Sequence, residues 1–376
     1  MKGARDQEGA AAAARQLDSH ERALEYCTFC PKLCRHSCPV AVGTSRETLI
    51  PQAKMQILQA LRVGDLPWRQ SYVEVLYGCA GCTRCREYCD HENDVASALF
   101  EGRAVARQRG VGHPALEELP DRWRAQNAKL AQTLRDDDRL AFATSGELGY
   151  LPAPQLIERG LAGAMSDVMS RADVVLPIVA DPPSFDAAYA LWAGGFVDSA
   201  RLAGEELLRR LRGFRAVVCD DAHAVSALSV WLPEHGISHN LEVLHSSELL
   251  ARHVEQLPVK RRRARAFYHD ACGIGRGLRC YEPPRAVVAR CVDELGELYH
   301  SRELSDCCAA AGLVPLTFPE ATTRASAHIA DEVALYQGDV LVSASPRCAA
   351  ALRASAPSTV EVLDLVELAR WACQAS

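Results

Sequence analysis

Eight of the sixteen cysteines fall into two closely spaced runs in the first hundred residues, and no other feature constrains the chain as strongly. The second run, residues 79–89, has the spacing Cys-x2-Cys-x2-Cys-x3-Cys. In this spacing a tight loop presents three thiolates to three iron corners of one [4Fe–4S] cube, and the fourth reaches a second cube. The first run, residues 27–38, reads Cys-x2-Cys-x3-Cys-x3-Cys and ends in Pro39. Two complete runs therefore predict two cubes.

Crossed ligation follows from this pattern, because the last cysteine of each run points to the other cube. The first cluster is expected to bind Cys27, Cys30, Cys34 and Cys89. The second is expected to bind Cys79, Cys82, Cys85 and Cys38. A pair of zinc sites is the alternative, since Cys-x2-Cys pairs also form zinc ribbons. No Cys-x2-His or His-x3-His pair accompanies the runs, which favours iron–sulfur clusters.

Length, charge and cysteine content limit the class of protein. A chain of 376 residues is long enough for two or three domains with a sizeable core. The net charge of -6 gives no sign of a nucleic-acid partner or of a membrane-binding surface. Sixteen cysteines without a signal peptide indicate a reducing compartment in which thiols hold metal. No transmembrane segment is expected, because no apolar run approaches ~18 residues. We therefore expect a cytoplasmic protein that reaches the inner face of a membrane only through a partner.

The pattern of the chain changes along its length and predicts five parts. Residues 1–20 form a flexible tail, 21–110 an all-helical domain that holds the two clusters, and 111–138 a helical linker. From 139 onward short β-branched runs alternate with helical patterns, which is typical of α/β domains with parallel sheets. Residues 139–258 and 259–376 are the two modules of this kind.

Within the N-terminal part, helices are predicted from Pro51, near Tyr72–Tyr77, and after Cys89 as far as Gly110. Helices packed around two cysteine runs resemble the all-helical ferredoxin domain of succinate dehydrogenase and glycerol-3-phosphate dehydrogenase iron–sulfur subunits. Small residues beside Cys79 allow backbone N–H groups to approach cluster sulfurs, and such hydrogen bonds tune the reduction potential.

The last module carries a second cysteine motif. Cys272 is followed after 34 residues by Cys307-Cys308, and after 36 more by Ser345-x2-Cys348. This motif resembles the cysteine-rich CCG module of the B and D subunits of heterodisulfide reductase, and of the glycolate oxidase and anaerobic glycerol-3-phosphate dehydrogenase iron–sulfur subunits. The family pattern is Cys, about 34 residues, Cys-Cys-Gly, about 36 residues, Cys-Pro-x-Cys. The chain departs from it in Ser345, which replaces a cysteine, and in Ala309, which replaces the glycine.

The resemblance implies a third metal centre in this module. In the family, five cysteines bind a non-cubane [4Fe–4S] cluster, and four remain here: Cys272, Cys307, Cys308 and Cys348. Such a cluster, a cubane, a zinc ion and an empty site all remain open. His269 and Asp270 lead into Cys272, as in the family, and either support the centre or close the strand locally.

An internal repeat relates the two modules. A shift of 126 residues places Ser345 on Cys219 and Cys272 on Gly146, whereas the ends of the modules align at a shift of 119. The first module is therefore predicted to be a degenerate CCG-like module that keeps the scaffold and almost none of the ligands.

Together these features predict an electron-transfer subunit rather than a complete enzyme. Two [4Fe–4S] clusters would pass electrons between a flavin-dependent dehydrogenase or electron-transfer flavoprotein and a quinone- or disulfide-linked acceptor, as the resemblance implies. The flavin is expected on another subunit, because the chain has no complete dinucleotide fingerprint. One alternative is a heterodisulfide-reductase-like catalytic subunit that uses the centre of the second module; another is a non-redox zinc scaffold.

Overall fold

The computed structural model describes residues 16–374, so most of the expected flexible tail lies outside the described residues. The chain divides into two compact units, and each is built from several segments. The first consists of residues 1–120, 190–197 and 309–325, and the second of 121–189, 198–308 and 326–376. Each unit is described on its own. The domain boundaries expected at 110, 138 and 258 stay predictions, because these units interleave segments rather than follow contiguous blocks.

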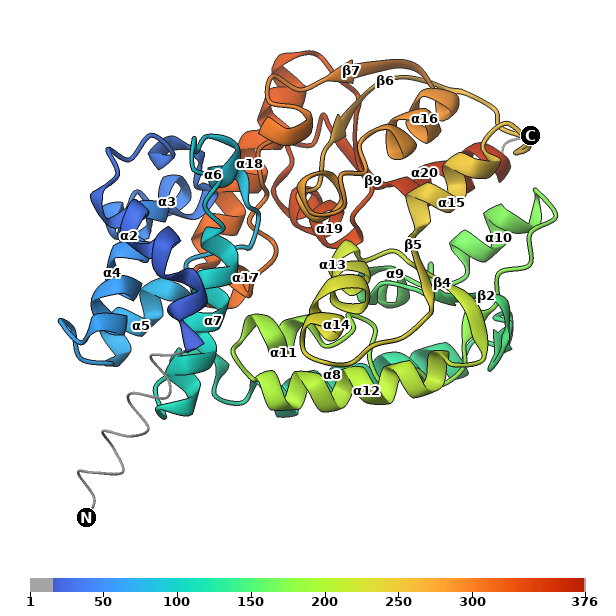
Figure 1. Ribbon diagram of the computed structural model, residues 1–376. Coiled ribbons are helices and arrows are strands. Elements are labelled where there is room, and N and C mark those ends of the chain that lie inside the picture. The colour runs from blue at the N-terminus through green and yellow to red at the C-terminus, as the bar shows by residue number, and fades with distance from the viewer. Residues whose placement is uncertain (1–15, 375–376) are drawn as a thin grey trace. The chain divides into compact units, whose positions relative to one another are not determined.

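The first unit is helical, as the sequence predicts (Figure 1). Pro51 starts the helix expected there, and Gly64, with φ +89°, ends it in the left-handed conformation that glycine adopts easily. The helices of the N-terminal segment are α2 (Glu21–Phe29), α3 (Pro39–Thr44), α4 (Pro51–Val63), α5 (Gln70–Leu76), α6 (Arg84–Glu87) and α7 (Val95–Gln108). Their apolar faces form one core, in which Leu24, Met55 and Leu99 are fully buried.

A buried arginine joins the later segments to this helical core. Arg103 on α7 has no exposed surface and stacks on the ring of Phe100. Its guanidinium donates to the carbonyls of Cys79 at 2.8 Å, Ala193 at 2.7 Å and Gly312 at 3.2 Å. The last two belong to the segments that contain α11 (Tyr189–Ala193) and α17 (Val314–Thr317). One cation therefore satisfies carbonyls from three distant stretches of the chain.

The second unit contains two parallel sheets, which confirms the predicted α/β character (Figure 1). The first sheet has the order β1-β3-β2-β4-β5 and the second β7-β6-β8-β9. The strands of the first sheet are β1 (Phe142–Ala143), β2 (Gly146–Leu151), β3 (Ile178–Val179), β4 (Phe214–Cys219) and β5 (Glu242–His245). Those of the second are β6 (Arg262–His269), β7 (Val292–Glu297), β8 (Val340–Ser343) and β9 (Glu361–Asp364).

Helices connect and cover these strands. They are α8 (Leu119–Arg135), α9 (Pro154–Glu158), α10 (Ala164–Ser170), α12 (Val197–Leu211), α13 (Ala222–Ser226), α14 (Leu232–Glu234), α15 (Ser246–His253), α16 (Glu282–Cys291), α18 (Pro319–Leu335), α19 (Pro346–Ser355) and α20 (Leu365–Gln374). Helices α10 and α15 of the first sheet pack against α16 and α20 of the second, so the two sheets share a helical layer (Figure 1). Among the described residues, no helix combines the length and apolarity that crossing a bilayer requires.

The strand registers correct the repeat alignment. Apart from β1, both sheets have the same relative order, with β3-β2-β4-β5 corresponding to β7-β6-β8-β9. Leu151 pairs with Cys219 at the end of the first pair, and His269 pairs with Ser343 at the end of the second. Cys219 therefore matches Ser343 at a shift of 124 residues, and the shift of 126 that placed it on Ser345 is wrong. A single shift fails because the loops between strands differ in length. Strands β5 and β9 begin 119 residues apart, as expected.

Candidate iron–sulfur centres

The four cysteines expected at the first cluster lie close together in the first unit. Cys27 is on α2, Cys30 follows that helix directly, Cys34 lies in the next loop, and Cys89 follows α6. Burial, together with the neighbouring cysteines Cys30 and Cys89, raises the pKa of Cys27 to about 11 and that of Cys34 to about 12. Ionising buried thiols so close together is unfavourable unless a cation offsets their negative charge. A bound metal centre would supply that positive charge. We call this set the first quartet.

The other four line one small enclosed cavity. Cys38, from the first run, faces the three cysteines of the second run that precede Cys89. The cavity is lined by Ser37, Cys38, Pro39, Val40, Pro51, Lys54, Cys79, Ala80, Cys82, Thr83, Cys85, Val95 and Ala96. The backbone N–H of Gly81 donates to the Cys79 sulfur at 3.4 Å, as the small residues around Cys79 predict. We call Cys38, Cys79, Cys82 and Cys85 the second quartet.

A buried lysine, which the sequence analysis missed, accompanies the second quartet. Lys54 on α4 is only 1% exposed. Its Nζ donates to the Gly78 carbonyl at 2.7 Å and to the Cys38 sulfur at 3.4 Å. Burial alone lowers the pKa of Lys54, but the thiolates of the second quartet outweigh it and raise the pKa above its ordinary value. Lys54 thus carries its charge beside these sulfurs. It lies on the same helical stripe as Leu58 and Leu61, and this apolar context was the signal that could have revealed it.

The first quartet has a neutral donor instead. Asn93, which is 8% exposed, directs its Nδ2 at the Cys27 sulfur, 3.3 Å away. Sequence analysis missed this residue as well, and its position outside both runs gives no signal. Because an ammonium carries a full charge and an amide does not, the two quartets lie in different electrostatic fields.

The cysteines of the second motif gather at the carboxyl edge of the second sheet. Cys272 follows β6, Cys307 and Cys308 follow β7, and Cys348 follows β8. β7 and β8 lie on opposite sides of β6, so the strand order reverses here, and ligand sites of parallel sheets lie at such points. The Cys308 and Cys348 sulfurs are 3.2 Å apart, and those of Cys272 and Cys307 are 3.8 Å apart. All four cysteines are buried.

Comparison with known proteins finds a matching domain family for each of the two cysteine-rich regions. Residues 23–93 match the 4Fe-4S dicluster domain, and residues 266–353 match the cysteine-rich domain abbreviated CCG. The chain therefore contains a 4Fe-4S dicluster domain and a CCG domain. The predicted resemblance is thereby confirmed, and the dicluster match supports iron–sulfur cluster binding.

Three relatives show what this chain is similar to. The D subunit of the dihydromethanophenazine:CoB–CoM heterodisulfide reductase of Methanosarcina acetivorans is 24% identical, over 92% of this chain and 93% of the relative. The B subunit of the fumarate reductase (CoM/CoB) of Methanothermobacter marburgensis is 24% identical, over 78% of this chain and 61% of the relative. The EtfAB:quinone oxidoreductase of Syntrophomonas wolfei is 33% identical, over 31% of this chain and 18% of the relative.

In the CCG domain, His269 and Asp270 hold the strand ends. The His269 ring contacts the Ser343 hydroxyl at 3.3 Å and the Asp306 carbonyl at 3.1 Å. Asp270 accepts two hydrogen bonds from Arg285, at 2.6 and 2.7 Å. Both side chains therefore fix the loops that carry Cys272 and Cys307, and they do so through other polar groups.

Ser345, at the position of the missing family cysteine, caps α19. Its hydroxyl accepts the backbone N–H of Cys348 at 3.4 Å. The hydrogen bond with Cys308, together with burial, raises the pKa of Cys348 well above its ordinary value. Four buried thiols fit a metal centre chemically, because a cation offsets the cost of ionising them.

Charged residues lie at the carboxyl edge of the first sheet, at the place that corresponds to where the second sheet carries the cysteines of its motif. Asp221 caps α13 and accepts from the ring of His223 at 3.0 Å and from Arg347 at 2.7 Å. A Cβ atom on Gly273 would lie 3.5 Å from the His223 ring, so this imidazole lies beside the loop that begins at Cys272. Sequence analysis did not single out these side chains, because they are joined only by the packing of the two sheets.

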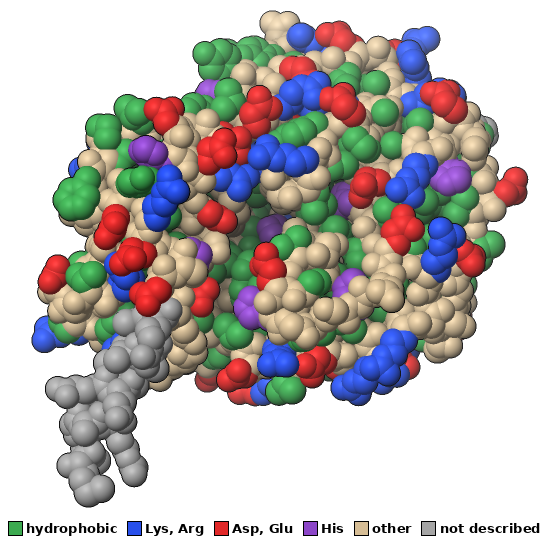
Figure 2. All heavy atoms as spheres, in the orientation of Figure 1, with side chains coloured by type: hydrophobic (Ala, Val, Ile, Leu, Met, Phe, Trp, Pro, Cys, Tyr) green, Lys and Arg blue, Asp and Glu red, His purple; other side chains and the backbone are tan. Residues whose placement is uncertain are grey.

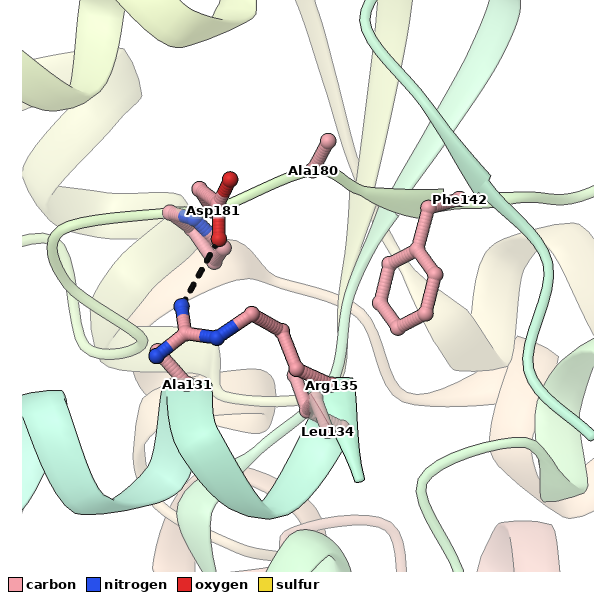
Figure 3. A pocket seen from close by; sticks show the side chains of 7 residues that line it. Ala131, Leu134, Arg135, Phe142, Ala180 and Asp181 are labelled. Atoms are coloured by element: carbon pink, nitrogen blue, oxygen red, sulfur yellow. Dashed lines mark hydrogen bonds and ion pairs between the residues drawn. The ribbon is translucent and has the colours of Figure 1, made fainter. Parts of the chain in front are cut away.

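A separate pocket of about 190 Å³ lies at the carboxyl end of β3 (Figure 3). Arg135 on α8 and Asp181 face each other there and form an ion pair of 2.8 Å, while Phe142 lines the other side. Both charged side chains are about half exposed, and such pairs contribute ~0–1 kcal/mol. No cysteine lines this pocket.

Single ions and clusters ask for different ligand geometries. Within residues 16–374, no three His, Cys, Asp or Glu side chains converge as ligands of one metal ion would. A cube receives its thiolates at separate iron corners, so its ligands surround a larger volume. The four cysteines of the second quartet lie around one cavity.

Proposed function

We propose that the chain is the electron-transfer subunit of an oxidoreductase complex and that it holds two [4Fe–4S] clusters by crossed ligation. The observation that carries this proposal is the second quartet, in which Cys38 of the first run lines one cavity with Cys79, Cys82 and Cys85 of the second. The first quartet completes the exchange with Cys89. When bound, such clusters accept and release single electrons.

The residues of the chain would supply the conditions for this transfer. The first unit buries four of the eight cysteines of the two runs, and burial limits the access of water to a cluster. Lys54 and Asn93 direct a charged and a neutral donor at different quartets. Hydrogen bonds and net charge around the sulfurs set cluster potentials, so these two residues make the two sites unequal.

The partners proposed are a flavin-bearing dehydrogenase or electron-transfer flavoprotein and a quinone- or disulfide-linked acceptor. Two relatives support this choice, since one is a subunit of a heterodisulfide reductase and another is an EtfAB:quinone oxidoreductase. A cytoplasmic location, with membrane contact only through a partner, belongs to the same proposal.

The second unit is proposed to contain two tandem CCG-like modules, the first without cysteine ligands. The shared strand order of the two sheets supports the duplication. A third centre at Cys272, Cys307, Cys308 and Cys348 would be a non-cubane cluster, a cubane or a zinc ion. The short sulfur–sulfur contacts support a bound cation there.

Metal and sulfide analysis of anaerobically prepared protein tests the proposal, together with EPR of the reduced sample. About eight irons and eight sulfides support two cubes, and about twelve irons add the third centre. Cys38→Ser should remove the signal of one cluster and leave the other. Cys373→Ser, which alters a buried cysteine outside the motifs, is the matched control and should keep both. Zinc without sulfide would overturn the proposal and favour the zinc scaffold.

A catalytic subunit of the heterodisulfide reductase kind is the second candidate. The 3.2 Å contact of the Cys308 and Cys348 sulfurs favours it, because thiols this close can react with one disulfide in turn. Under this alternative, Cys348→Ser abolishes disulfide turnover while both cubes remain reducible. Unchanged turnover in this variant would exclude it.

A further inference from the structure

Large apolar side chains are exposed around the first cysteine run. Phe29 is 87% exposed, Leu33 61% and Val42 62%. Phe29 directly precedes Cys30, and Leu33 directly precedes Cys34. Single exposed apolar residues are ordinary on a protein surface, but a group beside a functional centre is typical of an interaction site. Phe29 and Leu33 are thus the sequence neighbours of two cysteines of the first quartet.

Two of them line a groove of about 690 Å³ on the first unit. The groove contains Leu33, Val42, Lys32, Arg35, His36 and Arg46, among others. We call it the first-run groove. It is a shallow feature of the surface, which suits a protein face better than a small molecule, since small ligands are mostly enclosed.

Basic side chains outnumber acidic ones in the first-run groove, although the chain as a whole is acidic. Its lining includes three Lys or Arg side chains and one acidic residue, Glu47. Glu47 already accepts from the Arg35 Nε at 2.9 Å, which leaves Lys32 and Arg46 to set the sign of the local field. The net charge of the whole chain is -6. On the face shown in Figure 2, acidic and basic side chains are interspersed. A basic groove complements an acidic partner and attracts it over a distance.

The first quartet is also the more open of the two. Cys30, Cys34 and Cys89 are partly exposed, whereas Cys38, Cys79 and Cys82 are buried. Electron transfer slows steeply with the distance between donor and acceptor. A carrier that binds beside Cys30 and Cys34 therefore has the shorter path to the first cluster.

We propose that the first-run groove is the docking site for an acidic protein that carries a one-electron flavin or iron–sulfur cofactor. This inference rests on the proposed function and adds the face and the charge of the partner. On docking, the reduced carrier loses one electron and the first cluster gains it, with no covalent bond formed or broken. Transient redox contacts are small, below about 1,200 Å², so a few exposed apolar residues with a charged rim are sufficient.

Stopped-flow reduction of the clusters by reduced flavodoxin, an acidic flavoprotein, tests the site. At low salt, Lys32→Glu and Arg46→Glu should each slow the reaction about tenfold, because electrostatic steering raises association rates by ~10–10³. Lys129→Glu makes the same charge change on an exposed residue of α8 and should leave the rate within about twofold. At about 1 M salt, where the Debye length is ~3 Å, the wild type and variants should converge.

A second pair of variants tests the apolar contact. Leu33→Glu should slow reduction at every salt concentration, whereas Leu202→Glu, at a side chain 67% exposed, should not. EPR titration of each variant separates docking from a changed potential, because a variant that impairs docking alone keeps the reduction potential of the first cluster.

The outcomes distinguish the two proposals. If no cluster is found in the protein, the proposed function fails and the docking site with it. If both clusters are present and the groove variants behave like their controls, only the docking site is wrong. Saturable binding of the groove to vesicles with anionic phospholipids, lost in Lys32→Glu while flavodoxin rates are unchanged, would assign the groove to a membrane surface instead.

Discussion

Replacing Lys54 tests whether the two proposed clusters differ in reduction potential. Lys54→Met keeps an unbranched apolar stem and removes the ammonium that lies 3.4 Å from the Cys38 sulfur. Reduction adds negative charge to a cluster, and a nearby cation stabilises the reduced form more than the oxidised form. Removing the cation should therefore lower the reduction potential of the second cluster.

The size of the shift can be bounded from the structure. Two unit charges 4 Å apart interact by about 4 kcal/mol at an effective dielectric constant of 20. The added electron spreads over the whole cube, so a smaller effect of about 1–3 kcal/mol is expected. At about 59 mV per factor of ten for one electron, this corresponds to roughly 40–130 mV. Lys54→Gln, which keeps a neutral donor, should give a shift in the same direction.

Potentiometric titration followed by EPR measures both clusters in one sample. We expect the second cluster to fall in potential and the first to stay within about 20 mV, because its quartet has Asn93 and not Lys54 beside it. Arg62→Met is the matched control, since it removes a cation from the same helix that instead pairs with Asp18 and Glu21. An equal shift of both clusters, or an unchanged second cluster in Lys54→Met, would refute the reasoning.

Three further predictions concern stability. Arg103→Met should lower the free energy of unfolding by about 3 kcal/mol or more, because several buried carbonyls lose a charged donor, and chemical denaturation measures this. Gly312→Ala should lower the free energy of unfolding by more than about 1 kcal/mol, since φ is +62° and a Cβ atom would lie 2.4 Å from the Cys79 carbonyl oxygen. The same variant should disturb the EPR signal of the second cluster. Burial raises the pKa of Asp220 to about 6, so the folded state binds the carboxyl proton more tightly than the unfolded state, and the free energy of unfolding falls as pH rises from about 4 to 6. Asp220→Asn should make the thermal midpoint less dependent on pH in that window. An unchanged pH profile would contradict this prediction.

The sequence predicted what short-range spacing determines. The two runs indicated which cysteines gather, and the structure brings both quartets together, although their ligation stays a prediction. Pro51 marked the start of α4 because a proline at the first helical position is favoured whatever the rest of the fold. The alternation of strand and helix predicted parallel sheets for the same local reason.

What the sequence did not reveal depends on contacts between distant residues. Lys54 is read as an ordinary helical lysine until the cavity behind it is known. Arg103 and Gly312 are 209 residues apart in the sequence, and no local sequence pattern predicts their contact. The repeat shift of 126 was wrong because loops of unequal length moved Cys219 from one register position to another.

The contact between Arg103 and Gly312 has a consequence for how the protein is made. A ribosome adds about 5–20 residues per second, so Gly312 emerges roughly 10–40 s after Arg103. During that interval the carbonyl of Cys79 and the arginine beside it lack one of their closing segments. The buried guanidinium beside the second-run loop therefore gains its last backbone acceptor only late in synthesis, when most of the chain has been made.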